Sequence, residues 1–128
     1  MTEMVWIDLP GVLGIHAHHL DELGGASGLR DRKLLEATLA RPRQGHTYGD
    51  PDVFDLAAAY TAAIISNHLF LDGNKRTSFV VGILFSELNG LTFTASEADA
   101  TQAMLDLALG QITENQFAAW LRANSTPL

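Results

Sequence analysis

The sequence HLFLDGNKRT, residues 68–77, lies between the two most apolar stretches of the chain. Residues 56–66 read LAAAYTAAIIS on its N-terminal side, and residues 79–85 read FVVGILF on its C-terminal side. Apolar stretches of this kind belong in a protein core. We therefore predict two buried helices that meet at a turn formed by the residues in between.

The charge in this region is confined to the turn. Asp72, Lys75 and Arg76 are the only formally charged residues between Asp55 and Glu87. An unpaired charged group is expensive to bury. Three such groups at the junction of two core helices therefore indicate a functional role.

The sequence Asp72-Gly73-Asn74 is typical of a turn that precedes a helix, because Gly accepts positive φ and Asp and Asn cap helix starts. The helix is expected to begin at about Asn74 or Lys75, which puts Lys75 and Arg76 in its first turn. The helix dipole disfavours a cation there by about 0.3–1 kcal/mol unless an anion lies beside it. Backbone N–H groups, the dipole and two cations would then converge on that anion. These residues predict a phosphate site.

Two further residues add chemistry to this turn. Asp72 is suited to give one carboxylate to Mg²⁺, which prefers carboxylate oxygens, phosphate oxygens and water as ligands. His68 lies about one turn back, at the end of the preceding helix, and an imidazole titrates near neutral pH. The stretch thus offers a base, a metal ligand and an anion site within ten residues.

The stretch HLFLDGNKRT resembles the signature of the Fic/Doc (Fido) family, and specifically the Doc branch, the death-on-curing toxins. Ordinary Fic proteins carry H-x-F-x-D/E-G-N-G-R-x-x-R, whereas this chain has Lys75 at the second Gly and Phe79 at the last Arg. Both departures match Doc. The sequences Gly28-Leu29-Arg30-Asp31, Leu39-Ala40-Arg41-Pro42 and Leu88-Asn89-Gly90 also look like the Doc pattern.

The resemblance implies a compact Fido fold that uses ATP and Mg²⁺, and it implies a role for each residue of the turn. His68 would be the general base, Asp72 would bind Mg²⁺, Gly73 and Asn74 would build the anion nest, and Lys75 and Arg76 would hold nucleotide phosphates. The resemblance to the Doc branch also implies that Lys75 blocks a phosphate subsite and reverses the nucleotide, so that the γ-phosphate faces the acceptor. The acceptor implied by the family is a threonine of elongation factor Tu, whose phosphorylation stops translation.

The resemblance also implies an inhibitory partner. Fic proteins are often restrained by a helix of pattern S/T-x-x-x-E-G/N. The only Glu-Asn or Glu-Gly pair here is Glu114-Asn115, and the residue four positions before Glu114 is Gly110. The pattern is therefore missing, and inhibition is expected from a separate Phd-like antitoxin whose C-terminal segment folds into a groove on the toxin.

Composition sets the class of protein. With 128 residues, 47% hydrophobic and 18% charged, the chain is expected to form one domain, residues 1–128, around a single core. A net charge of −7 without a basic stripe argues against nucleic-acid binding. The absence of cysteine fits a cytoplasmic protein, and we expect no signal peptide and no membrane span.

Periodicity and capping signals predict an all-α, single-domain helical bundle of about six helices. The expected helices span about residues 8–23, 31–40, 52–70 and 74–88, then 96–110, with a sixth from Thr113 onward. Pro42 is expected to stop the second helix, because proline lacks the backbone N–H group. Residues 43–51 are expected to be an irregular connection, and residues 91–94 a short extended piece.

Several other residues invite a site assignment. His16, His18 and His19 could suggest a metal, but no carboxylate or third imidazole has a convincing spacing, so surface or partner-facing histidines are expected. The pair Arg30-Asp31 is either a loop-locking ion pair or part of the site. For Thr77, a first-turn backbone contact and a ligand contact both remain open.

Phe70 is expected to serve packing rather than chemistry. Tyr48 and His46 belong to the connection that could cover the site.

Three functions are weighed. The leading one is a toxin kinase that moves the γ-phosphate of ATP to a Thr or Ser hydroxyl of a protein. The second is nucleotidylation (AMPylation), as in ordinary Fic proteins. The third, from another class, is a non-catalytic module that uses the anion nest to dock a ligand or partner.

Overall fold

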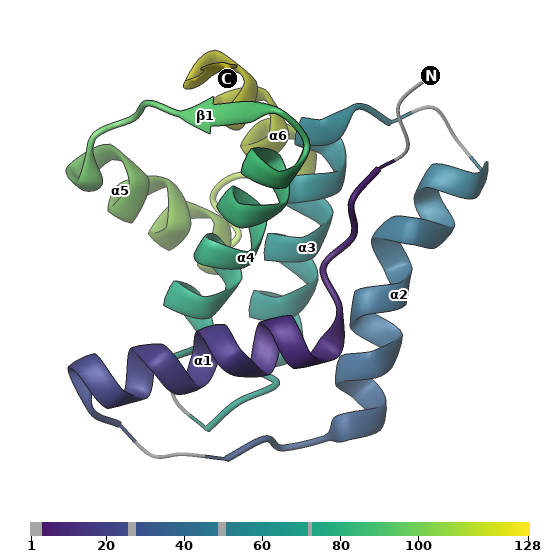
Figure 1. Cartoon of the computed structure of the whole chain (residues 1–128). Helices are drawn as coiled ribbons and strands as arrows, with labels where there is room; N and C mark the ends of the chain where they lie inside the picture. Colours follow the sequence, from purple (N-terminus) through teal and green to yellow (C-terminus); the bar gives the residue numbers. More distant parts are fainter. Residues whose placement is uncertain (1–3, 26–27, 49–50, 72) are drawn as a thin grey trace.

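The computed structural model describes residues 4–25, 28–48, 51–71 and 73–128, without the side chains of residues 23 and 46–48. Within them lie six helices and two short strands (Figure 1): α1 Leu9–Leu23, α2 Arg32–Tyr48, α3 Val53–Asn67, α4 Asn74–Leu88, β1 Leu91–Phe93, α5 Glu97–Ala108, α6 Glu114–Ala123 and β2 Ser125–Pro127. The predicted all-α fold of about six helices is confirmed. No helix in this part of the chain combines the length and apolar character that crossing a bilayer requires.

Side-chain caps fix most of the helix starts. Asp8 Oδ1 accepts a hydrogen bond from the backbone N–H of Gly11 at the start of α1, and Ser96 accepts from Asp99 at the start of α5. Asp52 and Thr113 form reciprocal capping boxes for α3 and α6. Each of these side chains satisfies a backbone donor that has no acceptor within the helix. Such capping residues are a local signal, so the sequence could predict these helix starts.

The predicted end of α2 at Pro42 is wrong, because the helix continues to Tyr48 and includes most of the expected irregular connection. A proline inside a helix costs about 3 kcal/mol. Tertiary contacts of this part of α2 offset the cost. The Pro42 ring is buried, and the Arg43 guanidinium lies 5.1 Å from the Trp6 ring centroid. Tyr48 and His46 thus belong to α2, and their side chains lie outside the described residues.

Helices α3 and α4 pack against each other at the centre of the molecule, with α1 crossing below them in Figure 1. The two helices approach each other closely at Gly82 of α4, where an added Cβ would collide with the Thr61 hydroxyl and lie 3.2 Å from the carbonyl oxygen of Ala57. Thr61 is fully buried, and its Oγ1 donates to the carbonyl oxygen of Ser78 at 2.9 Å. Only a glycine at position 82 leaves room for this hydrogen bond between the two helices.

Replacing Gly82 with alanine is expected to destabilise the fold by about 1–3 kcal/mol, because overpacking forces core groups apart. The free energy of unfolding in urea measures this. Gly14→Ala is the matched control: no atom lies within 4 Å of its added Cβ, so helix propensity should stabilise α1 by up to about 1 kcal/mol. If both variants gave the same stability, the close approach would not constrain the core.

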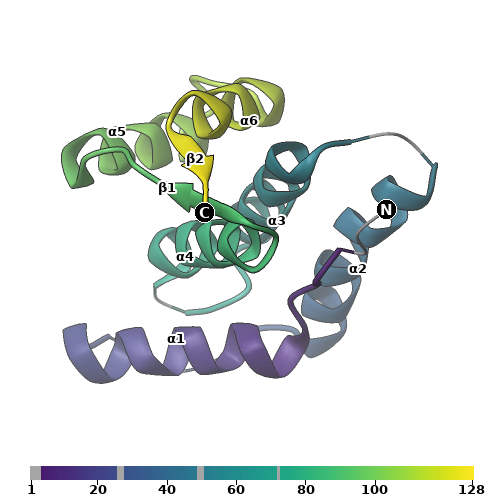
Figure 2. The ribbon, with the colours of Figure 1, turned by 45° about the horizontal axis from the view of Figure 1, so that its top comes forward.

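Both described ends of the chain attach at the C-terminal end of α4. Strand β1 pairs antiparallel with β2, and Leu128 N–H donates to the carbonyl oxygen of Gly90 at 2.9 Å (Figure 2). At the other end of the chain, Val5 exchanges two hydrogen bonds with the side chain of Asn89, the C-cap of α4. The expected extended piece is confirmed as β1, whereas β2 was not predicted. The connection between α3 and α4 therefore lies at the opposite, N-terminal end of α4.

Candidate active site

The connection between α3 and α4 is held in place by the segment that precedes α2. Leu29 and Phe70 form an isolated antiparallel bridge. Backbone N–H of Arg30 donates to the carbonyl oxygen of Leu69 at 2.7 Å, and N–H of Leu71 donates to the carbonyl oxygen of Gly28 at 3.2 Å. These bonds fix the path of the backbone immediately after His68.

His68 caps the C-terminus of α3 in a left-handed conformation, with φ 44° and ψ 57°. It is the only non-glycine residue with positive φ in the part of the chain that the structure describes. Its side chain is exposed, and its carbonyl oxygen accepts a hydrogen bond from Arg30 Nη1 at 3.3 Å. Non-glycine residues in this region are strained by about 1–3 kcal/mol, and such strain concentrates at functional sites. Glycine is the commonest residue at a left-handed helix end, because it adopts this conformation without strain.

Phe70 is 2% exposed, which confirms its predicted packing role. Its ring stacks on the imidazole of His16, with 3.7 Å between centroids and 13° between planes. The expectation that His16 lies on the surface is therefore wrong, since it is 5% exposed. The reason is tertiary: α1 passes directly against the connection and α4, so this face of α1 is covered.

Asn74 shapes the connection through its side chain. Its Oδ1 accepts a hydrogen bond from the backbone N–H of Phe70 at 3.0 Å, and its Nδ2 donates to the carbonyl oxygen of Phe70 at 2.8 Å. The amide therefore closes the loop between α3 and α4 and is not directed to a ligand. What Asn74 offers to an anion is its backbone N–H.

Helix α4 begins after Gly73, which has φ 79° and no side-chain cap. The first intrahelical bond recorded here is from Thr77 N–H to the carbonyl oxygen of Gly73, at 3.0 Å. N–H groups in the first turn of a helix have no intrahelical acceptor. Together with the positive end of the helix dipole, they favour an anion at this position.

Lys75 and Arg76, both exposed, line a cleft of about 400 Å³ between α1, α4 and α5. The third basic side chain in the cleft is His19 of α1. The remaining lining residues are largely apolar: Phe79, Val80, Glu97, Ala100, Thr101, Met104 and Leu105. Among the described residues, His68 does not line this cleft.

Asp72, the predicted metal ligand, lies outside the described residues. No group of three or more His, Cys, Asp or Glu side chains in the described part of the chain could hold a metal ion. The described residues therefore provide no alternative metal site, and the metal site at Asp72 stays a prediction.

The remaining histidines of α1 differ from each other. His18 is exposed and lies 3.2 Å from the carboxylate of Glu22. His19 is partly buried; its Nδ1 is buried and has no hydrogen-bond partner among the described residues. Burial, followed by the positive charge of Arg76, lowers the pKa of the His19 imidazole below its usual value. The expectation of surface histidines thus holds for His18 alone.

No ion pair between Arg30 and Asp31 is observed among the described residues, whereas Arg30 does contact a predicted site residue. Arg30 donates to the carbonyl oxygen of His68, and Asp31 Oδ1 accepts from the backbone N–H of Leu34 at the start of α2. Arg30 is therefore a positioning residue for the connection. The Thr77 hydroxyl is buried without a hydrogen-bond partner among the described residues, so the backbone contact considered for it is not formed there.

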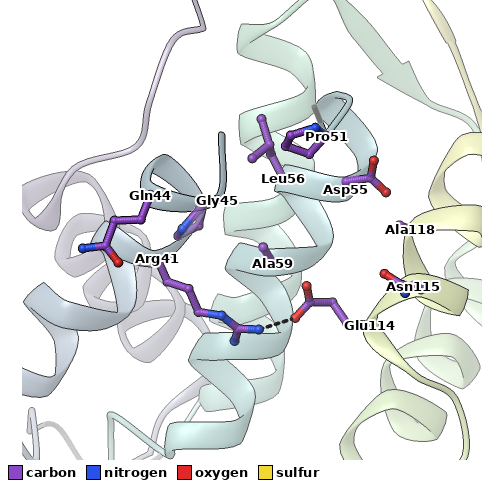
Figure 3. Close-up of a pocket in the computed structure, with 11 residues that line it drawn as sticks. Arg41, Gln44, Gly45, Pro51, Asp55, Leu56, Ala59, Glu114, Asn115 and Ala118 are labelled. Carbon is purple, nitrogen blue, oxygen red and sulfur yellow. Dashed lines mark hydrogen bonds and ion pairs between the residues drawn. The ribbon is translucent and has the colours of Figure 1, made fainter. Parts of the chain in front are cut away.

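A second, larger hollow of about 790 Å³ lies between α2, α3 and α6 (Figure 3). Arg41 Nη2 and Glu114 Oε1 form an ion pair across it at 3.0 Å. In the described part of the chain, none of the residues predicted to take part in chemistry lines this hollow. The candidate site is therefore the connection before α4 and the cleft beside it, which together provide an exposed imidazole, an uncapped helix start and basic side chains.

Comparison with known proteins gives two findings. The profile of the Fic/DOC family matches residues 6–86. Toxin Doc of Mycolicibacterium smegmatis is 40% identical over 75 residues, which cover 56% of this chain and 57% of that protein. The match thus spans little more than half the length of this relative.

Proposed function

The chain belongs to the Fic/Doc family, and from this premise we propose that it is the toxin of a toxin–antitoxin system and acts as a protein phosphotransferase. It would move the γ-phosphate of ATP to a Thr or Ser hydroxyl of a translation factor, with elongation factor Tu as the acceptor implied by the family. The relative's name, Toxin Doc, supports the first part of the proposal.

In this proposal His68 is the general base, which takes the proton from the acceptor hydroxyl. Lys75 and Arg76 hold the phosphates in the cleft, beside the open N–H groups that follow Gly73. Phosphoryl transfer depends on positioning and on neutralising charge, so basic side chains and backbone donors are the main groups required.

Asp72 would bind Mg²⁺, which when bound neutralises phosphate charge. The basic cleft fits the phosphate groups. The fit to the metal rests on Asp72 alone.

The observation that carries the proposal is the conformation of His68. The chain keeps a strained, exposed imidazole at the end of α3, where glycine would be more stable, and the next helix starts uncapped with two cations in its first turn. A structural role explains neither feature. General base catalysis beside an anion site explains both.

The direct test is incubation of the purified chain with elongation factor Tu, Mg²⁺ and ATP labelled on either the γ- or the α-phosphate. We expect the γ-label on a Thr or Ser of the acceptor. Transfer of the α-label would instead indicate AMPylation. If neither label were transferred while ATP bound to the chain, a non-catalytic binding module would be the better description.

Replacing Lys75 with glycine is expected to shift the product from phosphorylated toward AMPylated acceptor, because it removes the side chain proposed to block a phosphate subsite. Intact-mass measurement of the acceptor separates the two products. Lys75→Met is the matched control, since it keeps the bulk of the side chain and removes its charge. Phosphate transfer by Lys75→Met with AMP transfer by Lys75→Gly would identify bulk as the cause; an unchanged product in Lys75→Gly would remove Lys75 from this role.

An antitoxin partner is part of the same proposal. The relative's name implies a toxin, and this chain shows no inhibitory-helix pattern of its own. Expression of the chain alone is expected to arrest growth and translation, and co-expression of a Phd-like antitoxin is expected to restore both.

A further inference from the structure

His19 is the residue of the cleft that the family signature does not include. It lies on α1, about fifty residues before Lys75 and Arg76 in sequence, and shares the same cleft with them. Among the described residues, two cations and one carboxylate, Glu97, line the cleft, so their formal charge is positive, although the whole chain carries −7. A positively charged cleft on a protein with a negative net charge favours an anionic ligand.

The state of the His19 ring in the free protein is the second observation. Nδ1 is buried without a hydrogen-bond partner among the described residues, and the neighbouring Arg76 opposes a positive charge on the ring. The charged and titratable groups that face it are His16, His18 and Glu22 on α1, with Arg76 on α4. Lys75 of α4 and Glu97 of α5 line the same cleft. Glu22 acts in the opposite direction and raises the pKa of His19, but burial and Arg76 have the larger effects.

We propose that His19 is a third phosphate ligand of this cleft and takes up a proton from solvent when a phosphate chain enters beside Lys75 and Arg76. The proposal rests on the proposed function, because it assigns the polyphosphate of the nucleotide to this cleft. A polyphosphate adds negative charge to a cleft whose described residues carry a net positive charge. It offsets the repulsion from Arg76 and gives the protonated ring an acceptor.

The sign of the pH dependence follows from linkage. In the free protein the pKa of His19 is lowered by burial and by Arg76, so the ring is neutral at pH 7. A bound polyphosphate raises that pKa, so binding consumes a proton. Affinity should therefore increase as the pH falls through the window between the raised pKa of the bound state and the lowered pKa of the free protein.

The experiment is isothermal titration of the full chain with Mg²⁺-ATP and, separately, with inorganic tripolyphosphate, in pairs of buffers that differ in ionisation enthalpy. The difference between buffers gives the number of protons taken up. His19→Asn carries an amide near the position of Nδ1 that can form a hydrogen bond but cannot take up a proton. We expect it to lose the proton uptake and to bind both probes at least about tenfold more weakly near pH 6.5, since a charge-assisted hydrogen bond is lost.

His18→Asn is the matched control. This neighbouring histidine points to solvent and pairs with Glu22, so its replacement should leave the affinity and the proton uptake close to those of the parent. A measurement on the unmodified protein guards against a folding defect in the variant. The ring resonances of His19 in the nuclear magnetic resonance spectrum should move toward the protonated form when tripolyphosphate is added at pH 7.

The outcomes are distinguishable. If the parent binds both probes but His19→Asn matches it in affinity and proton uptake, the role of His19 is overturned and the phosphate site remains. If tripolyphosphate binds with the expected dependence on His19 but no label reaches any acceptor, the proposed kinase activity fails and the role of His19 stands. Absence of binding by either probe would overturn both.

Discussion

Replacing His68 with alanine is expected to lower phosphoryl transfer by about 10²–10⁴-fold, the usual contribution of a general base. Thermal unfolding should change little, because the side chain is exposed and its recorded hydrogen bond is made by the backbone carbonyl oxygen. His68→Gly is the sharper variant. It removes the imidazole and relieves the left-handed backbone strain, so it should be at least as stable as the parent and equally inactive.

The measurement is initial transfer rate from γ-labelled ATP, paired with thermal and urea unfolding of each variant. His18→Asn serves as a control for the loss of an exposed histidine and should retain full activity. If His68→Gly transferred phosphate as fast as the parent, His68 would have no part in the chemistry. A rate loss that followed a loss of stability would point to folding instead.

Replacing Phe70 with alanine is expected to destabilise the protein by about 3–5 kcal/mol, because it empties a fully packed aromatic site. The loss includes the stacking contact with His16 and weakens the bridge between Leu29 and position 70. The free energy of unfolding in urea measures the effect. Activity should fall with stability, since the buried ring anchors the connection between His68 and Asn74 against α1.

The comparison variant for this site is Phe70→Leu, which keeps much of the apolar volume and should cost clearly less than alanine. A loss below about 1 kcal/mol for Phe70→Ala would mean that the connection does not depend on this ring. Its buried position would then be of little energetic consequence.

Most of the helices were predictable because their signals are local. The capping residues Asp8, Asp52, Ser96 and Thr113 each bond to a backbone group three residues on, and the apolar runs on either side of the turn form α3 and α4. The path of α2 through Pro42 was not predictable, because contacts distant in sequence outweigh a local signal there. Strand β2 was missed for a similar reason, since three residues form a strand only where β1 is available to pair.

The same distinction between local signals and tertiary contacts applies to the candidate site. Lys75 and Arg76 belong to one turn of helix, so their shared position follows from spacing alone. The positions of His16 and His19 depend on how α1 crosses α4, and the contact of Arg30 with His68 depends on the bridge to the connection. Neither contact produces a recognisable pattern within a short stretch of sequence, because the residues that form it are far apart in the chain. The three-residue spacing of His16 and His19 puts both on one face of a helix, and this was the single signal in the sequence that related their positions.

The attachment of Val5 at Asn89 and of Leu128 at Gly90 has a practical consequence for handling the protein. Helix α4 has 15 residues, and at 1.5 Å per residue it separates that end from the turn before Asn74 by roughly 20 Å. A purification tag or a fluorophore joined at Leu128 would therefore emerge far from the imidazole. Protein labelled at this position is suitable for the transfer and binding assays described above.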